Sequence, residues 1–226
     1  MKFLKQKDTL NVLNFDNKEI QPSRHGSLLP NTVRSIIVAS SGGGKTNLML
    51  SLLFDENGLK FDNVYVYSKS LYQPKYQLLS EVMNNIKEVT YFPYRESDDI
   101  LDPEEAQMNS IFIFDDVACD KQDKIRSYFS MGRHKAVDCF YLCQSYARIP
   151  KHLIRDNANF LIIFKQDELN LKHIYDDHVG VDMTFETFKE MCGECWNEKY
   201  GFLIIDKDRD VDKGRYRKNF DCFIII

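Results

Sequence analysis

The sequence lacks long apolar runs, and its few cysteines are widely spaced. No stretch approaches roughly 18 consecutive apolar residues, so the sequence predicts no membrane span. The opening residues, MKFLKQKDTLNV, carry lysines but no apolar segment behind them, which argues against a secretory signal. Six cysteines are scattered over 226 residues, a spacing that suits reduced thiols better than a disulfide framework. Together these absences favour an intracellular protein.

An excess of positive charge is also missing. The formal net charge is −4 at pH 7, which argues against a general binder of polyanions. The distribution is uneven, because residues 121–155 hold eight Lys/Arg against two acids, whereas residues 95–105 hold six acids against one arginine. The stretch 121–155, called the basic block below, predicts either a solvated helical face or a local surface for anions.

Short apolar runs alternate with helical patterns along most of the chain. Residues 1–30 are polar, and we expect an N-terminal arm there, followed by one domain over 31–226. The expected strands are 32–40, 63–68, 110–116, 137–144, 159–165, 200–206 and 220–226. The expected helices are 45–54, 76–87, 124–132 and two between 168 and 195, with 89–106 irregular. Strands that are continuously apolar predict an α/β fold, with a mostly parallel central sheet, helices on both faces and an antiparallel C-terminal hairpin at one edge.

A glycine-rich segment, ASSGGGKTNL at 39–48, follows the apolar run SIIVA. It matches the phosphate-loop pattern G-x-x-x-x-G-K-[ST] except that Ala39 replaces the first glycine, a position that needs a small residue. In such a loop backbone N–H groups surround the phosphates, the lysine reaches the β and γ oxygens, and the hydroxyl residue binds Mg²⁺. The flanking strand and helix argue against a mere glycine linker. The predicted nucleotide-binding residues are Ser40, Ser41, Gly42, Gly43, Gly44, Lys45, Thr46 and Asn47.

Two carboxylates, Asp115 and Asp116, end the apolar run IFIFDD. We expect this strand beside the one that precedes the phosphate loop. An aspartate there can hold the magnesium ion together with Thr46, and a second carboxylate can polarise the attacking water. We therefore assign Thr46 and Asp115 to the metal and Asp116 to catalysis, against the alternative of an ordinary acidic turn.

Two further residues complete a hydrolysis site. Gln144 ends the next strand at the same sheet edge, where an amide can sense the γ-phosphate; the alternative is an ordinary polar strand end. Arg133, in SMGRHK, precedes that strand and could reach the nucleotide of a neighbouring subunit. The alternative for Arg133 is a surface or DNA-facing arginine.

The ordered set of motifs resembles the DNA-packaging ATPases of large DNA viruses, virophages and Polinton-type elements, a poxvirus-type group within the FtsK/HerA branch of P-loop ATPases. The resemblance rests on the loop 39–46, the strand 111–116, GRH at 132–134 and the stretch 144–166, and it covers about residues 30–225. It implies an ATP- and Mg²⁺-dependent ring that moves double-stranded DNA into a preformed capsid without reading its sequence. It further implies that a capsid or vertex protein is a partner. The expected location is the host cytoplasm or nucleus, at the site of virion assembly, together with an association with the virion.

The same resemblance implies the roles of three residues. Asp116 would be the catalytic carboxylate, Gln144 the γ-phosphate sensor and Arg133 the finger acting on a neighbour's nucleotide. Wider relatives commonly carry glutamate where Asp116 stands, so its role as direct base stays open. The basic block fits a motor that grips DNA phosphates. The candidates are Lys121, Lys124, Arg126, Lys135, Arg148, Lys151 and Arg155.

Two rival functions and two weaker signals remain. A GTP-type switch would explain the Lys-x-Asp at the end of LIIFKQD, but Phe164 stands where Asn or Thr is needed, and DDVA lacks the glycine of a switch motif. A small-molecule kinase would need an arginine-rich lid, which 146–155 could supply.

We interpret the pair Cys192 and Cys195 as thiols, because a zinc site needs a second pair. The spacing of His173 and His178 likewise favours a solvated helix over a metal site.

Overall fold

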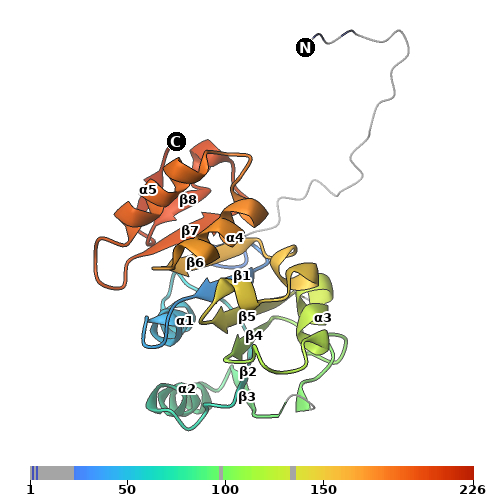
Figure 1. Cartoon of the computed structure of the whole chain (residues 1–226). Helices are drawn as coiled ribbons and strands as arrows, with labels where there is room; N and C mark the ends of the chain where they lie inside the picture. The colour runs from blue at the N-terminus through green and yellow to red at the C-terminus, as the bar shows by residue number, and fades with distance from the viewer. Residues whose placement is uncertain (1, 3, 5–22, 97–98, 133–135) are drawn as a thin grey trace.

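The computed structural model describes residues 2, 4, 23–96, 99–132 and 136–226. Nine strands of this part of the chain form one sheet in the order β3-β2-β4-β5-β1-β6-β7-β8-β9 (Figure 1). The strands are β1 Arg34–Val38, β2 Asn63–Ser68, β3 Thr90–Tyr94, β4 Ser110–Asp115, β5 Val137–Cys143, β6 Phe160–Phe164, β7 Phe202–Asp206, β8 Tyr216–Lys218 and β9 Cys222–Ile224. The α-helices are α1 Lys45–Phe54, α2 Pro74–Asn85, α3 Asp123–Met131, α4 Glu168–His178 and α5 Phe185–Cys195.

The sheet is parallel from β3 to β6 and antiparallel from β6 to β9. This confirms the predicted α/β fold with a mostly parallel sheet and an antiparallel C-terminal edge. That edge holds one strand more than expected, because β8 lies between β7 and β9 and pairs with both. The run YRK of β8 is short and polar, so its pattern gave no strand signal.

The prediction for residues 89–106 was wrong at its start. Thr90–Tyr94 forms β3, which pairs in parallel with β2 at the open edge of the sheet. Pro93 made this stretch look irregular, but an edge strand tolerates a proline, because one side of its backbone needs no partner in the sheet.

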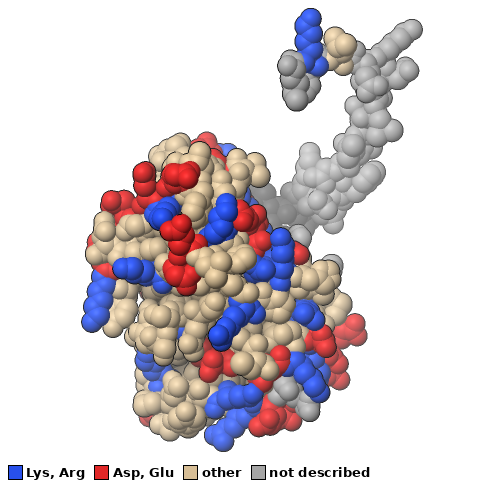
Figure 2. All heavy atoms as spheres, viewed as in Figure 1, with Lys and Arg blue, Asp and Glu red and all other residues tan. Residues whose placement is uncertain are grey.

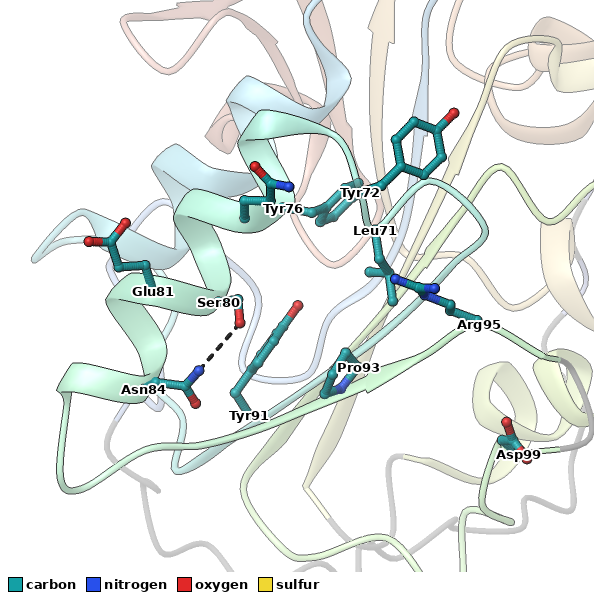
Figure 3. Close-up of a pocket in the computed structure, with 11 residues that line it drawn as sticks. Leu71, Tyr72, Tyr76, Ser80, Glu81, Asn84, Tyr91, Pro93, Arg95 and Asp99 are labelled. Atoms are coloured by element: carbon teal, nitrogen blue, oxygen red, sulfur yellow. Dashed lines mark hydrogen bonds between the residues drawn. The ribbon is translucent and has the colours of Figure 1, made fainter.

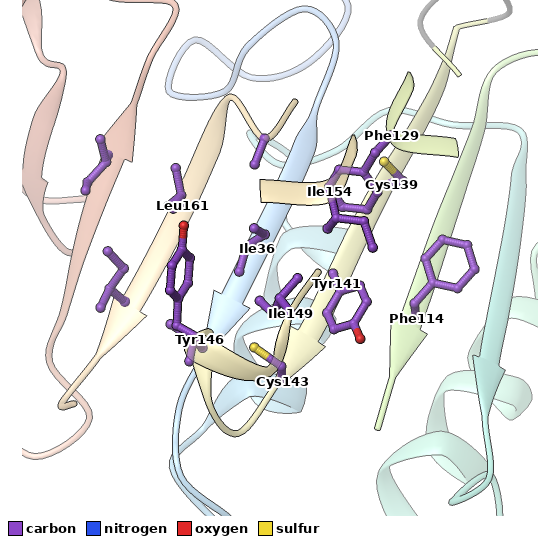
Figure 4. Packing of buried hydrophobic residues seen from close by; sticks show 14 of the residues in the cluster. Ile36, Phe114, Phe129, Cys139, Tyr141, Cys143, Tyr146, Ile149, Ile154 and Leu161 are labelled. Carbon is purple, nitrogen blue, oxygen red and sulfur yellow. The ribbon is translucent and has the colours of Figure 1, made fainter. Parts of the chain in front are cut away.

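Helices cover both faces of the sheet. Alternate residues of β1 separate the two cores: Ile36 and Val38 pack with residues of α3, α4 and α5, whereas Ile37 packs with residues of α1 and α2. Figure 1 shows α1 and α2 on one side of the strands and α3 on the other. Figure 4 shows the first core, in which Ile36, Tyr141 and Leu161 from three adjacent strands face the same layer. The central strands are thus buried on both sides, as continuous apolar runs require.

The segment just before β1 is tied to the sheet by Asp138, a fully buried carboxylate of β5. Asp138 accepts hydrogen bonds from the Val33 N–H at 2.7 Å and from His25 Nε2 at 2.9 Å. His25 Nδ1 accepts from the Lys60 N–H at 3.0 Å, so the ring proton lies on Nε2 and points at the carboxylate. Arg24 adds an ion pair to Asp138 at 2.9 Å. Residues 23–30 therefore contact the domain, and a boundary at residue 30 stays a prediction.

Candidate nucleotide-binding site

The phosphate loop connects the end of β1 with the start of α1. Gly42 and Gly44 have φ values of 72° and 108°, a left-handed conformation that glycine adopts without steric cost. A Cβ added at Gly43 would lie 2.9 Å from the Cβ of Ala39, which is itself fully buried. Gly43 therefore leaves room for the Ala39 methyl group, which explains why alanine is accepted at position 39.

Lys45, the first residue of α1, folds back across its own loop. Its Nζ donates to the carbonyl oxygens of Ala39 at 2.8 Å and Ser40 at 3.2 Å. Burial lowers the pKa of Lys45, and the nearby Asp115 carboxylate opposes that shift. The amine thus lies over the loop at the N-terminus of a helix, where a phosphate group is favoured by the helix dipole and the free N–H groups.

The predicted residues Asp115, Asp116 and Gln144 meet at one edge of the sheet, although the order of the strands differs from the expected one. Residue Asp115 ends β4, Gln144 follows β5, and β5 lies between β4 and β1. The strand that carries Asp115 is therefore one place further from the loop than we predicted. A cavity of about 120 Å³ lies at this edge. Its lining residues are Ser41, Gly42, Lys45, Thr46, Ser70, Gln73, Asp115, Asp116, Leu142 and Gln144.

Asp116 leaves the strand in an unusual conformation. Its φ is 59°, in the left-handed region that residues other than glycine adopt rarely, while its N–H still donates to the Leu142 carbonyl at 3.4 Å. Such a conformation costs about 1–3 kcal/mol and is often retained at functional sites. The exposed Asp116 and the buried Asp115 therefore occupy different environments although they are adjacent in sequence.

Tyr76 of α2 is a site residue that sequence reasoning missed. Its hydroxyl donates a hydrogen bond to Asp115 Oδ2, and the Thr46 side chain lies close enough to lower the pKa of the same hydroxyl. Burial raises the pKa of Asp115, while the hydrogen bond from Tyr76 and the charge of Lys45 oppose the rise. Burial likewise raises the pKa of Tyr76 well above its ordinary range, which keeps the hydroxyl a donor.

The side chains fit a magnesium ion. Mg²⁺ prefers oxygen ligands, and Thr46 and Asp115 line the same small cavity, where the Tyr76 hydroxyl binds the Asp115 carboxylate. Their oxygens therefore converge on one small region beside the loop. Thr46 and Asp115 would hold the ion, which would supply positive charge to neutralise the phosphates.

Not every predicted residue is part of this arrangement. Ser40 and Gly43 line a second cavity on another side of the loop. Asn47 is exposed on α1 and is among the lining residues of neither cavity. Arg133, the predicted finger, lies outside the described residues, as does Lys135.

The weaker sequence signals lead to no second site. Cys192 and Cys195 are buried free thiols, and no group of three or more His, Cys, Asp or Glu suited to a metal occurs in the part of the chain that the structure describes. The expectation of a solvated helix was wrong for His178, which is buried, with its Nε2 2.7 Å from the Tyr146 hydroxyl. In the same described part, no helix has the length and apolar character needed to cross a membrane.

Much of the basic block is already paired within the fold. Arg155 binds the Asp177 carboxylate at 2.7 Å, and Lys151 binds it at 3.1 Å. Arg126 pairs with Asp123, and Lys124 donates to the Ile100 carbonyl. Figure 2 shows a face on which Lys and Arg are interspersed with acids rather than gathered in one patch. Lys121 and Arg148 are exposed, which makes them the block's best-placed candidates for an anion.

The fold has solved relatives. The genome packaging NTPase of Sulfolobus turreted icosahedral virus 2, in complex with sulfate, is 17% identical with a TM-score of 0.55, and the alignment covers 78% of this chain and 92% of that one. Its complex with ATP-gammaS gives 15% identity, a TM-score of 0.52 and coverage of 78% and 93%. The DNA-packaging ATPase of Sulfolobus turreted icosahedral virus is 15% identical with a TM-score of 0.53, and the alignment covers 77% of this chain and 92% of that one. At these identities the likeness establishes the fold.

Sequence comparison identifies the family. No curated protein sequence matches the chain. A family model described as Poxvirus A32 protein matches residues 21–206, which is well over half of the 226 residues. The match includes the phosphate loop, both aspartates and Gln144, and it confirms the poxvirus-type group predicted from the motifs. The chain therefore belongs to the Poxvirus A32 protein family.

Proposed function

We propose that the protein is an ATP-hydrolysing motor that moves double-stranded DNA into a viral capsid. The observation that carries the proposal is the meeting of Lys45, Asp115 and Gln144 around one cavity at the carboxyl edge of a parallel sheet. Family membership and the fold shared with genome packaging NTPases, one of them bound to ATP-gammaS, support the same function.

The chemistry is positioning and electrostatics. The loop N–H groups, the N-terminus of α1 and Lys45 bind the β- and γ-phosphates, because all three present positive charge to the same point. Thr46 and Asp115 hold Mg²⁺. Asp116 orients and polarises the attacking water, and Gln144 contacts the γ-phosphate. The water oxygen forms a bond to the γ-phosphorus while the bond between that phosphorus and the bridging β–γ oxygen breaks. The products are ADP and phosphate.

Assembly and partners complete the proposal. Arg133 of a neighbouring subunit stabilises the transition-state charge, so hydrolysis depends on a ring of copies. Exposed basic residues such as Lys121 and Arg148 contact DNA phosphates without reading bases. A capsid or vertex protein receives the motor where virions assemble in the host cell.

Hydrolysis of ATP and GTP, measured at fixed salt with and without long double-stranded DNA, tests the function. We expect ATP turnover that rises with DNA and is lost in Lys45→Ala, because the β/γ-phosphates lose their cation. Lys87→Ala, at an exposed lysine away from the loop, is the matched control and should behave as the unchanged protein. Turnover indifferent to DNA would contradict the motor and favour a kinase, and tight GTP binding without turnover would favour a switch.

A further inference from the structure

A second cavity adjoins the phosphate loop, on a different side from the cavity that holds the carboxylates. It measures about 380 Å³ and is lined by Ser40 and Gly43 of the loop, by the end of β6, and by the segment 196–201 between α5 and β7. Both cavities border the loop, but different loop residues line them. Ser41, Gly42, Lys45 and Thr46 line the carboxylate cavity, whereas Ser40 and Gly43 line the second one. A ligand that follows the loop can therefore reach both.

The volumes assign different parts of a nucleotide to the two cavities. Small-molecule sites measure about 300–1,000 Å³, so the carboxylate cavity of about 120 Å³ suits only phosphate groups and a metal ion. The second cavity is large enough for a nucleoside. A cavity of about 740 Å³ between α2 and β3 is larger still, but none of its lining residues belongs to the loop (Figure 3). Tyr76 lines that cavity and donates to Asp115, so it stands between this space and the carboxylate site.

The segment 196–201 is held firmly against the sheet. The Trp196 Nε1–H donates to the carbonyl oxygen of Ile163 in β6 at 3.0 Å. A Cβ at Gly201 would lie 2.2 Å from the Cys195 carbonyl oxygen, so the chain turns there in a space that admits only glycine. The wall that this segment forms is thus built into the fold.

Tyr200 is the unusual residue of this wall. Its φ is 67°, a left-handed conformation that is an outlier for a bulky side chain, and 57% of the residue is exposed. A Cβ at Gly44 would lie 3.6 Å from Tyr200 Cδ1 and 3.4 Å from Phe164 Cε1, so both rings flank the loop. An aromatic ring held in a strained conformation and left in water beside a phosphate loop suggests a ligand that stacks on it.

The charges beside the ring suit a nucleotide. Lys199 Nζ lies 5.0 Å from the centre of the Tyr200 ring, and Lys165 lines the same cavity. Both lysines line a cavity that Ser40 and Gly43 of the loop also line, so they bring positive charge to a site for a phosphate-bearing ligand. Glu198 and Asn197 also line the cavity and offer an acceptor and a donor to a base or a ribose.

We propose that this cavity binds the nucleoside part of the nucleotide and that Tyr200 stacks on its base. The inference rests on the proposed function, since it takes the loop to bind a nucleoside triphosphate. Stacking on an aromatic side chain accepts any base, because every base has a π-face. The subsite therefore contributes affinity for the nucleoside rather than a choice between adenine and guanine.

Calorimetric binding of two probes in the presence of Mg²⁺ separates the subsite from the loop. ATP has a nucleoside and inorganic tripolyphosphate has none. Tyr200→Ala should weaken ATP binding about tenfold and leave tripolyphosphate binding unchanged, because only the stacking contact is removed. Tyr200→Phe keeps the ring and should bind ATP like the unchanged protein. Tyr72→Ala removes a comparably exposed tyrosine, 69% against 57%, that lies outside the cavity and should change neither affinity.

The outcomes that overturn the proposal are distinct. If Tyr200→Ala leaves ATP binding unchanged, or weakens both probes equally, the cavity is not the nucleoside subsite, although the loop still binds phosphates. If the unchanged protein binds neither probe, the proposed function itself is wrong and the subsite is lost with it. Unchanged tripolyphosphate binding by the variant also shows that it is folded.

Discussion

Tyr76 connects α2 to Asp115, one of the two residues assigned to the metal. Its hydroxyl donates a hydrogen bond to that carboxylate, and its ring is buried between α2 and the sheet. Residues that hydrogen-bond a metal ligand fix its orientation, and their loss commonly lowers metal affinity about 10–100-fold. Tyr76 is thus a positioning residue for the magnesium site.

Replacing Tyr76 by phenylalanine should raise the Mg²⁺ concentration needed for half-maximal nucleotide binding about tenfold. The ring and its packing stay, whereas Asp115 loses the donor that holds its Oδ2 in place. Fluorescent-nucleotide binding titrated with Mg²⁺ measures the shift. The affinity for the nucleotide in the absence of Mg²⁺ should stay unchanged, whereas a general loss of structure would lower it.

Tyr91→Phe provides the control for this substitution. Tyr91 lines the same groove between α2 and β3 as Tyr76 (Figure 3). Its substitution should leave the Mg²⁺ titration unchanged. A titration of Tyr76→Phe that coincides with that of the unchanged protein would contradict the positioning role.

Most phosphate-side residues of the candidate site could be predicted, because their signals are local. Lys45 and Thr46 follow from the loop pattern, and the carboxyl ends of parallel strands bring Asp115 and Gln144 to the same edge. Tyr76 and Tyr200 could not be predicted, since their roles depend on which segments pack beside the loop. The position of β5 between β1 and β4 could not be predicted either, because an apolar run does not indicate which strands will be its neighbours in the sheet.

The strands that the sequence did not predict lie toward the edges of the sheet, where the apolar signal weakens. The buried strands β2 and β4 are continuous apolar or aromatic runs, and their expected bounds were correct to within a residue. In contrast, β3 carries a proline and β8 carries Arg217. The polar strand β8 is held by the side-chain partners of Arg217, whereas β3 packs through Phe92 and Tyr94 against Tyr65.

Arg217 is the partner that holds β8 in place. It is 1% exposed, and its guanidinium binds Asp206 of β7, the Gly214 carbonyl and the Leu28 carbonyl. Arg217→Met should lower the free energy of unfolding by about 3–5 kcal/mol, because Asp206 is left buried with an incomplete set of partners. Urea denaturation measures the change.

Two further variants test that explanation. Combining Arg217→Met with Asp206→Asn should restore much of the lost stability, since the uncompensated buried charge is gone. Lys213→Met breaks an exposed ion pair to Asp210 in the neighbouring turn and should have no measurable effect. A single Arg217 variant as stable as the unchanged protein would show that the pair contributes nothing to this edge.

His178 gives helix α4 a pH dependence. Burial lowers its pKa from 6.5 to about 3, and Lys207, Arg155 and Arg215 add to the shift while Asp177 opposes it. The unfolded chain binds the proton at higher pH than the folded one, so this contribution to stability is complete above about pH 6.5 and is lost as the pH falls toward 3. The linkage predicts a loss of about 2 kcal/mol at pH 5.

Urea denaturation at pH 7.5 and pH 5 checks this linkage. His178→Gln cannot take up the proton, so the difference in stability between the two pH values should shrink by about that amount. His173→Gln, on the same helix, should retain the full difference. Equal pH dependence in all three proteins would place the acid sensitivity elsewhere in the fold.

At the scale of the whole molecule, the charge pattern limits how DNA can bind. The net charge of −4 repels a polyanion, and several cations of the basic block are occupied by Asp177 and Asp123. Binding must therefore come from a few exposed cations acting on phosphates. Lys121 and Arg148 are exposed, and they belong to the segments that follow the carboxyl ends of β4 and β5, the edge of the sheet that carries the candidate site.

Neutralising Lys121 and Arg148 together should reduce the salt dependence of DNA binding. Each lost phosphate contact lowers the slope of log K against log salt by about 0.9, so the double variant Lys121→Gln/Arg148→Gln should lose about 2 units. Binding to a long duplex of unrelated sequence, followed from low to moderate salt, measures the slope. The control Lys75→Gln/Lys87→Gln removes the same charge from the exposed surface around α2, so it separates a lost contact from a general change in net charge. If both pairs lower the affinity equally and leave the slope unchanged, the basic block is a solvated face and DNA is bound by another surface.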